Sequence, residues 1–288
     1  MNTEKNCIQK GVLYLVGTPI GNLSDISERA LKVFSEVDFI AAEDTRNSMR
    51  LLTHFDIKKP LISYFEHNKR ERGEQIIARL KNGESAALIT DAGMPAISDP
   101  GEDLVRLCSE QGVGVTTVPG PCAAITALTL SGLSTIRFSF EGFLPASKSD
   151  RKKILGELAN EKRTMIFHEA PHKLKATVSD MAEIFGNERK AAFCRELTKL
   201  NEQILRITLG EAKEYYSTNE PRGEFVIVVE GASSESSSAL FWSEMTIPEH
   251  VIFYINSGMS KNDAIKAAAK DRKLSKNDVY SQVLDIKV

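Results

Sequence analysis

Three loops rich in glycine, proline and small side chains each follow an apolar segment typical of a buried strand. They are GTPIGN at residues 17–22, DAGMPAISDPG at 91–101 and PGPCAAITAL at 119–128. In an open sheet of parallel strands, loops at the carboxyl ends of the strands line the ligand crevice, and glycine allows a ligand to approach the backbone. Ordinary tight turns also favour these residues. Three loops of this length nevertheless indicate one shared ligand cleft.

Other motifs for catalysis or metal binding are absent or interrupted. HEAPH at residues 168–172 matches H-E-x-x-H, which binds zinc through two histidines on one face of a helix. Pro171 does not fit the middle of such a helix, and we expect it at the first position of a helix that follows a strand. The sequence has no P-loop, dinucleotide or nucleophile-elbow motif. We therefore expect no metal and no ATP hydrolysis.

The composition is that of a globular protein without a strong overall charge. The 288 residues are 42% hydrophobic and 26% charged, with a formal net charge of −2, so a nucleic acid would have to be bound by local basic patches. The four cysteines are scattered without a C-x-x-C pair, which argues against a disulfide framework. No segment has the ~18 apolar residues of a membrane span, and the N-terminus lacks a signal-peptide core. We expect a cytoplasmic protein that binds no membrane.

Short apolar runs alternate with amphipathic segments in the first part of the chain. Runs typical of strands begin at Val12, Asp38, Pro60, Ser85 and Gly114, and segments with helical spacing of apolar residues lie between them. Alternation of strand and helix predicts an α/β domain with a mostly parallel sheet.

The pattern changes near residue 137, where one strand candidate is followed by a polar, basic loop. Two later strand candidates flank Asn201 with no helix between them, which indicates antiparallel pairing and a mixed sheet. We therefore predict α/β domains at residues 1–137 and 138–231.

The remaining residues predict a linker and a small helical domain at 239–288. The linker is ASSESSS at residues 232–238, whose small polar side chains cannot form a core. Ser260 and Ser275 each precede a helical pattern and have an aspartate three residues later, as in a capping box.

Nine segments in order between residues 12 and 231 resemble the bacterial 16S ribosomal RNA ribose 2′-O-methyltransferases. This family belongs to the tetrapyrrole-methylase-like (class III) superfamily of S-adenosylmethionine-dependent enzymes. The family more often has Ser and Arg where this chain has Ala170 and Lys173. The last part of the chain resembles the helical C-terminal domain of the family. The nine segments are TPIGNLSDISERAL, AAEDTR, LISYFEHN, DAGMPAISDPG, VPGPCAAITAL, EGFLP, EAPHKL, RELTKLNE and RGEFVIVVEG.

The resemblance implies two α/β domains of tetrapyrrole-methylase type that bind S-adenosylmethionine in the cleft between them, in a homodimer. Amides at loop ends and helix N-termini can bind the carboxylate of such a ligand, and backbone carbonyls can bind its adenine. The cofactor-binding residues that the resemblance implies are Thr18, Pro19, Gly93, Met94, Pro95, Ile97, Cys122, Ala123, Phe167, Gly223 and Glu224.

The implied reaction is in-line attack of a ribose 2′-hydroxyl on the methyl carbon of the sulfonium, at cytidine 1402 of 16S ribosomal RNA in the 30S subunit. Positioning of the reacting atoms should supply most of the acceleration, and a general base should add a factor of ~10² to 10⁴. An acid beside an arginine can orient a hydroxyl while the guanidinium binds a phosphate, although a structural ion pair would use the same residues. The candidates are Glu43, Asp44, Arg46, Arg195 and Glu196.

Two basic segments, HNKRER at 67–72 and KSDRKK at 148–153, are candidates for binding RNA phosphates; solvated helix faces have the same composition. Two other functions stay open. A tetrapyrrole-type methylase of small molecules would need a roomy apolar cavity, and a non-enzymatic RNA-binding module would not bind S-adenosylmethionine. The residues expected to contact RNA are Lys69, Arg70, Lys148, Arg151, Lys152 and Lys153.

Overall fold

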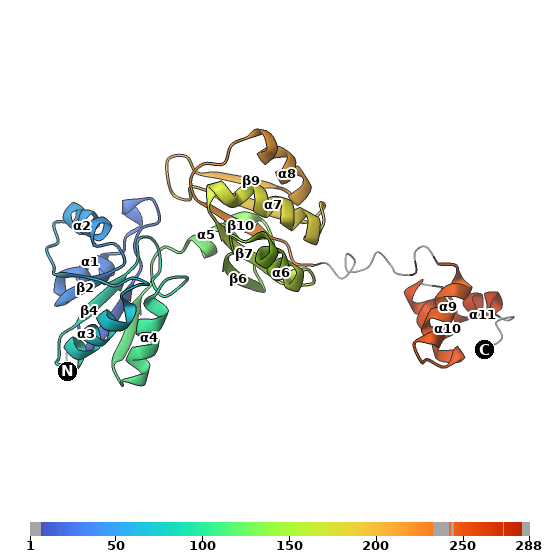
Figure 1. Ribbon diagram of the computed structural model, residues 1–288, viewed down its shortest axis with the longest axis horizontal. Helices are drawn as coiled ribbons and strands as arrows, with labels where there is room; N and C mark the ends of the chain where they lie inside the picture. The colour runs from blue at the N-terminus through green and yellow to red at the C-terminus, as the bar shows by residue number, and fades with distance from the viewer. Residues whose placement is uncertain (1–6, 233–241, 243–244, 273, 284–288) are drawn as a thin grey trace. The chain divides into compact units, whose positions relative to one another are not determined.

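The computed structural model describes residues 7–232, 242, 245–272 and 274–283. The chain divides into two compact units, residues 1–231 and 232–288, which Figure 1 shows with their helices and strands. The first unit contains two five-stranded sheets. No helix in the described ranges is both long enough and apolar enough to cross a membrane.

The first sheet consists of parallel strands in the order β3-β2-β4-β1-β5. Its strands are β1 (Val12–Val16), β2 (Phe39–Ala42), β3 (Leu61–Ser63), β4 (Ala86–Ile89) and β5 (Gly114–Val118). Strands β2 and β4 are buried at every position, as expected for a parallel sheet covered on both faces. The prediction of a mostly parallel sheet is therefore confirmed.

Helices cover both faces of this sheet (Figure 1). The apolar residues of α1 and α2 pack with one face, and those of α3 and α4 pack with the other. The turn after β1 includes a short 3₁₀ helix, η1. These elements are η1 (Leu23–Asp25), α1 (Glu28–Glu36), α2 (Thr45–His54), α3 (Lys69–Lys81) and α4 (Gly101–Glu110).

The second sheet is mixed, with the order β6-β7-β10-β8-β9. Strands β6 and β7 are parallel, and the other neighbours are antiparallel, including the predicted pair around Asn201. The prediction of a mixed sheet is confirmed. The strands are β6 (Phe138–Phe143), β7 (Thr164–Glu169), β8 (Lys190–Arg195), β9 (Gln203–Thr208) and β10 (Phe225–Val229).

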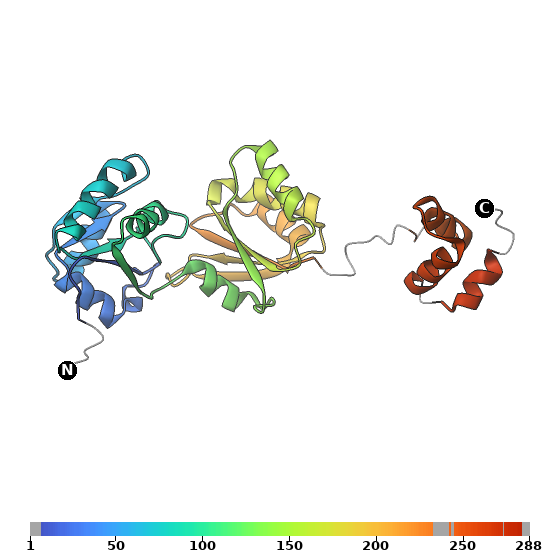
Figure 2. The ribbon, with the colours of Figure 1, turned by 90° about the horizontal axis from the view of Figure 1, so that it is seen from below.

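Four helices cover the two faces of the second sheet. Helices α6 (Lys148–Leu158), α7 (Pro171–Phe185) and α8 (Leu209–Thr218) lie on one face, and α5 (Ala123–Ser131) lies on the other (Figure 2). Pro171 is the first residue of α7, as the sequence predicts, because that position needs no backbone N–H.

Helix α5 follows the third glycine-rich loop but packs against β7, β8, β9 and β10 of the second sheet. Its buried residues Ala124, Ala127 and Leu128 share a core with Ile166 and Val226. The domain boundary predicted at residues 137 and 138 falls after α5, in the connection to β6. The third loop therefore leads directly from the first sheet to the face of the second.

The second unit contains three described helices, α9 (Ile247–Asn256), α10 (Lys261–Asp271) and α11 (Lys276–Gln282). The Ser260 and Ser275 side chains accept hydrogen bonds at the starts of α10 and α11, which confirms both predicted N-caps. Helix α9 is an addition to the predicted pair. Most of the predicted linker at 232–238 lies outside the described residues.

Arg151 of α6 is buried, which corrects the prediction that it binds RNA. Its side chain is 6% exposed, and its Nε and Nη2 atoms donate to Asp180 Oδ2 of α7 at 2.8 and 2.7 Å. Its Nη1 atom donates to the carbonyl of Ala146 at 3.2 Å. The guanidinium thus joins α6 to α7 and has no free face for a phosphate.

We expect Arg151→Ala to destabilise the protein by about 3–5 kcal/mol, because the buried Asp180 carboxylate loses both hydrogen bonds from the guanidinium and keeps only Lys152, whose Nζ lies 3.9 Å away. The matched control is Lys153→Ala, an exposed residue of the same helix, which should change stability by no more than about 0.5 kcal/mol. Urea unfolding of both variants measures the difference. Equal midpoints for the two variants would contradict the structural role of Arg151.

Candidate functional site

The three glycine-rich loops meet through their backbones at the carboxyl edge of the first sheet. Thr18 and Gly93 form an isolated antiparallel bridge, with N···O distances of 2.9 Å from Thr18 N to Gly93 O and 3.1 Å in the reverse direction. The Gly17 amide donates to Val118 O at 3.2 Å. These contacts are possible because β4, β1 and β5 are neighbours in the sheet. The structure thus brings together the loops that the sequence singles out.

The first and third loops also require glycine where they touch. A Cβ atom on Gly17 would lie 2.7 Å from the Cα of Gly120, and a Cβ on Gly120 would lie 2.8 Å from the Cα of Gly17. In the second loop, Gly93 has a φ of +85°, a conformation that other residues rarely adopt. The close approach of the three loops therefore depends on the absence of side chains at these positions.

A cavity of about 350 Å³, which we call the loop cleft, opens beside this junction. One wall comes from the three loops and α5, and the other comes from the ends of β7, β8 and β10 and from nearby segments. Most of the lining is apolar. Its residues are Ile20, Ala92, Gly93, Met94, Ile97, Cys122, Ala123, Ala124, Phe143, His168, Glu169, Ala170, Pro171, Cys194, Leu197, Glu224, Phe225 and Val226.

His168 is the principal unsatisfied polar group in the loop cleft. Its Nε2 atom is buried without a hydrogen-bond partner in the structure, and its ring lies edge-on to Phe140 and Phe143 at centroid distances of 5.1 and 5.3 Å. Burial lowers the pKa of His168 below its usual value, and Glu224 partly opposes this shift. A neutral imidazole is thus available to make a hydrogen bond with a ligand.

Acidic groups on or beside the second wall of the cleft are already held by local partners. Glu169 accepts a hydrogen bond from the Ala170 amide at 2.9 Å. Glu196 accepts from the Glu224 amide at 3.0 Å and pairs with Lys199 at 2.9 Å. The amide of Glu224, followed by Lys199, keeps the pKa of Glu196 below its usual value. Glu196 is therefore a fixed carboxylate at neutral pH.

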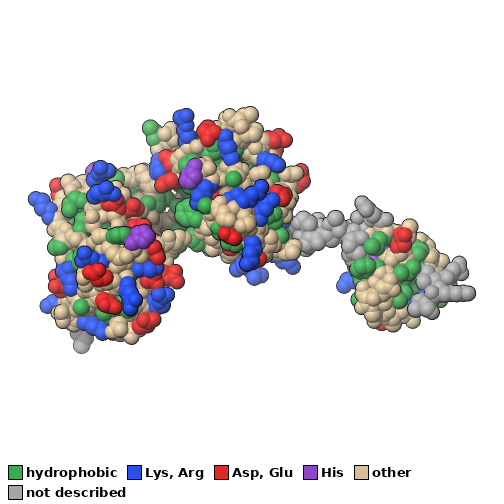
Figure 3. Space-filling view, in the orientation of Figure 1, with side chains coloured by type: hydrophobic (Ala, Val, Ile, Leu, Met, Phe, Trp, Pro, Cys, Tyr) green, Lys and Arg blue, Asp and Glu red, His purple; other side chains and the backbone are tan. Residues whose placement is uncertain are grey.

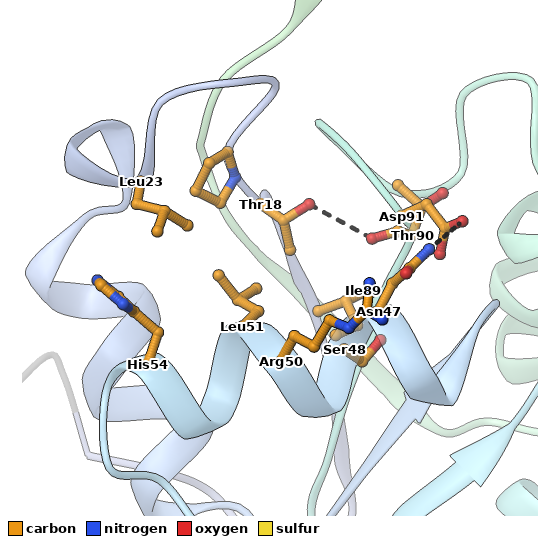
Figure 4. A pocket seen from close by; sticks show the side chains of 11 residues that line it. Thr18, Leu23, Asn47, Ser48, Arg50, Leu51, His54, Ile89, Thr90 and Asp91 are labelled. Atoms are coloured by element: carbon orange, nitrogen blue, oxygen red, sulfur yellow. Dashed lines mark hydrogen bonds between the residues drawn. The ribbon is translucent and has the colours of Figure 1, made fainter. Parts of the chain in front are cut away.

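A second cavity, the α2 pocket, lies on the first sheet (Figure 4) and also has a volume of about 350 Å³. It is lined by one face of α2 together with residues from the ends of β1 and β4. Thr18 Oγ1 donates to Thr90 O at 3.3 Å within it. The lining residues are Thr18, Pro19, Leu23, Asn47, Ser48, Arg50, Leu51, His54, Ile89, Thr90 and Asp91.

The first group of predicted catalytic residues lies between the end of β2 and the first turn of α2. Glu43 Oε2 accepts a hydrogen bond from Thr90 Oγ1 at 2.8 Å. Asp44 caps α2 and holds Arg46 through two side-chain contacts of 3.1 and 2.7 Å. Hydrogen bonds from Arg46 lower the pKa of Asp44 to about 2. Asp44 is therefore a weak base at neutral pH and is better suited to orient Arg46.

The second predicted group lies on the second sheet. Arg195 ends β8, and its Nε donates to the carbonyl of Arg222 at 2.6 Å. Its neighbour Glu196 belongs to the network with Lys199 and Glu224 described above. No hydrogen bond or ion pair of the described residues joins this group to Glu43, Asp44 or Arg46.

Six of the predicted cofactor-binding residues line the loop cleft, namely Gly93, Met94, Ile97, Cys122, Ala123 and Glu224. Thr18 and Pro19 line the α2 pocket instead. Pro95 is buried and lines neither cavity. Gly223, with φ of +79°, has no side chain, which allows Glu196 to pack against its backbone.

Phe167 is the clearest displacement from the predicted site. Its side chain is fully buried in the core between the second sheet and α7, whereas the next residue, His168, lines the cleft. Successive side chains of a strand point to opposite faces, so a shift of one residue moves the contact to the other side. The polar His168 within the apolar strand TMIFHE was the signal that could have identified it.

The predicted RNA-binding lysines and arginines differ in their availability. Lys148, Lys153 and Arg70 are exposed. Lys152 pairs with Glu183 at 2.6 Å, and Lys69 pairs with Asp103 at 2.6 Å. Figure 3 shows Lys and Arg side chains interspersed with acidic ones over the first unit. Basic charge is thus present locally and is partly neutralised.

Known proteins share both the sequence and the fold of this chain. The family model for tetrapyrrole (corrin/porphyrin) methylases matches residues 12–213. Ribosomal RNA small subunit methyltransferase I of Halalkalibacterium halodurans is 47% identical over 285 residues, covering 98% of each chain. The protein of the same name from Bacillus subtilis is 46% identical over 272 residues, covering 94% of this chain and 93% of its own.

Solved structures support the fold independently. Diphthine synthase superposes with a TM-score of 0.59 at 16% identity, covering 76% of this chain and 90% of that one. Cobalt precorrin-4 methyltransferase superposes with a TM-score of 0.58 at 17% identity, covering 76% and 95%. From its matched domain and its near-full-length relatives, the chain belongs to the tetrapyrrole methylase family and, within it, to the ribosomal RNA small subunit methyltransferase I proteins.

Proposed function

We propose that this protein methylates a ribose 2′-hydroxyl of 16S ribosomal RNA with S-adenosylmethionine bound in the loop cleft. The observation that carries the proposal is the junction of three glycine-rich loops beside a mostly apolar cavity, in a chain whose relatives are ribosomal RNA methyltransferases by name. S-adenosylmethionine supplies an activated methyl group. The protein must bind it, exclude water and align the acceptor oxygen.

The residues of the loop cleft fit such a ligand. Helix α5 begins at Ala123 in the cleft, and its N-cap residue Cys122 makes no side-chain capping bond, so its first amides can bind a carboxylate. The orphan Nε2 of His168 can bind a polar group of the adenosine. Met94, Ile97 and Phe225 supply apolar surface, which is typical of small-molecule sites.

The acceptor hydroxyl would be oriented by residues between the end of β2 and the first turn of α2. Glu43, already a hydrogen-bond acceptor for Thr90, can accept the hydroxyl proton, and Asp44 holds Arg46 where its guanidinium can bind a phosphate. Arg195 and Glu196 would help to orient the acceptor from the side of the second sheet. Because the sulfonium is an intrinsically reactive donor, alignment rather than strong base catalysis should dominate.

The finer parts of the proposal concern the partner and the assembly. Exposed Arg70, Lys148 and Lys153 are the best placed of the predicted residues to contact phosphates. The homodimer is implied by the family resemblance. The choice of cytidine 1402 in the 30S subunit, and action in the cytoplasm, follow from the family resemblance.

Two alternatives predict different binding behaviour. A small-molecule methylase would bind S-adenosylmethionine but would not modify ribosomal RNA; the solved tetrapyrrole-type methyltransferases are only 16–18% identical to this chain. A non-enzymatic RNA-binding module would not bind S-adenosylmethionine at all. Calorimetry with the cofactor, followed by methyl transfer to 30S subunits, separates all three functions.

We expect Ala123→Phe to weaken S-adenosylmethionine binding at least tenfold, because the ring would fill the loop cleft at the start of α5. Ala176→Phe, an exposed position on α7, is the matched control and should bind like the unaltered protein. Titration calorimetry measures both affinities. Equal affinities for the two variants would place the cofactor elsewhere.

We expect Asp44→Asn to reduce methyl transfer at least tenfold while leaving cofactor affinity unchanged. Asparagine caps a helix as well as aspartate does, so the variant removes the charge that holds Arg46 and keeps the start of α2. Asp56→Asn is the control, since Asp56 is exposed with φ of 55°, a conformation that asparagine tolerates.

Glu43→Gln should show the same pattern as Asp44→Asn if Glu43 accepts the hydroxyl proton. Initial rates with 30S subunits at saturating cofactor measure all three variants. Unchanged turnover in Asp44→Asn would remove Asp44 from the mechanism, and unchanged turnover in Glu43→Gln would remove Glu43.

A further inference from the structure

The α2 pocket borders the loop cleft along two shared loops. Thr18 and Pro19 line the pocket and the next residue, Ile20, lines the cleft. In the second loop, Thr90 and Asp91 line the pocket, whereas Ala92, Gly93, Met94 and Ile97 line the cleft. A ligand that extended from the pocket across the Thr18–Gly93 bridge would therefore reach the cleft.

One face of α2 supplies most of the chemistry of the pocket. Asn47, Arg50, Leu51 and His54 follow the spacing of neighbours on a helix, and Figure 4 shows their side chains along the same side of α2. Leu23 of η1 lies across from Leu51 and His54 in this view. The pocket thus has an apolar slot between η1 and α2, of the kind that accepts a flat ring.

The polar end of the pocket is dominated by hydrogen-bond acceptors. Asn47 Nδ2 donates to Asp91 Oδ2 at 3.2 Å, which leaves Asp91 Oδ1 and the amide oxygen of Asn47 to accept bonds from a ligand. An amino group would satisfy these acceptors, whereas a carbonyl oxygen in the same place would be repelled by the carboxylate. Asp and Glu carboxylates of proteins accept hydrogen bonds from the exocyclic amines of nucleobases in this way.

Arg50 provides a cation at the same pocket. It lines the cavity and is exposed, and it forms no ion pair with any residue that the structure describes. An arginine without a carboxylate partner is suited to binding a phosphate oxygen. The combination of apolar slot, acceptor pair and free guanidinium matches the ring, amine and phosphate of one nucleotide.

We propose that the α2 pocket binds one nucleotide of the RNA substrate. Asp91 and Asn47 select a base that carries an exocyclic amino group, and Arg50 binds the phosphate of the same nucleotide. This inference rests on the proposed function, because RNA methylation supplies the ligand. It assigns substrate selection to α2 and to the first half of the second loop. Cofactor binding stays in the adjoining cleft.

Cytidine and uridine 5′-monophosphates test the inference directly, since uracil lacks the amino group. With S-adenosylmethionine present, the cytidine nucleotide should bind at least about fivefold more tightly than the uridine nucleotide, measured by NMR titration. Asp91→Asn should abolish this preference while leaving cofactor affinity unchanged. Equal binding of the two nucleotides, or no saturable binding of either up to about 10 mM, would overturn the inference.

A bulky substitution gives a second test with the natural substrate. Leu51→Trp should fill the slot and raise the KM for 30S subunits at least tenfold without changing cofactor affinity. Met49→Trp adds the same ring on α2 at an exposed position outside the pocket lining and should behave like the unaltered protein. Equal KM values for the two variants would overturn the inference. Failure of the unaltered protein to bind cofactor or transfer methyl would instead reject the proposed function.

Discussion

The close backbone contact of three loops is the constraint on which the whole site depends. Thr18 and Gly93 pair as a two-residue bridge, and Gly17 and Gly120 approach so closely that neither can carry a Cβ. Neighbouring parallel strands bring the loops to one edge, and the glycines then allow them to touch. Both cavities border this junction, so their positions relative to one another are fixed by backbone rather than by side chains.

The second sheet completes a cleft that the first sheet begins. Helix α5 starts at the cleft and packs its apolar residues on the second sheet, so one helix both presents its N-terminal amides and ties the third loop to the opposite wall. The charged groups nearby are neutralised in pairs, as in Asp44 with Arg46 and Glu196 with Lys199. Charged groups that are paired in this way can hold reactants in fixed positions, but they are poorly suited to exchange protons with them. This suits a transfer reaction whose rate depends mainly on alignment.

Much of the fold could be predicted from the sequence because its signals are local. Apolar runs followed by glycine and proline mark the strands and their loops, and the absence of a helix near Asn201 identifies the antiparallel pair. The packing of α5 could not be predicted in this way. Its residues are apolar on most sides, which indicates that the helix is buried but not which sheet it packs against. Helix α2 carries few apolar residues, and the pocket along its face also depends on Asp91, which comes from the loop after β4.

The site was predicted less completely than the fold because single residues depend on direction and partners. Phe167 and His168 are adjacent in β7, and only the placement of α7 on one face decides which of them meets the cleft. Arg151 lies in a basic segment that is typical of a surface, but Asp180, 29 positions later, buries it in an ion pair. Contacts of this kind, between residues far apart in the sequence, depend on tertiary packing and cannot be predicted from the spacing of residues along the chain.

The most direct test of the account is the location of the methyl group that the protein transfers. The purified protein would be incubated with 30S subunits from a strain lacking it and with S-adenosylmethionine carrying a labelled methyl group, and the labelled position would be mapped by resistance to alkaline cleavage and by mass spectrometry. The account predicts the label on one ribose 2′-oxygen of 16S ribosomal RNA. Label on a base or on protein, or no transfer at all, would contradict it.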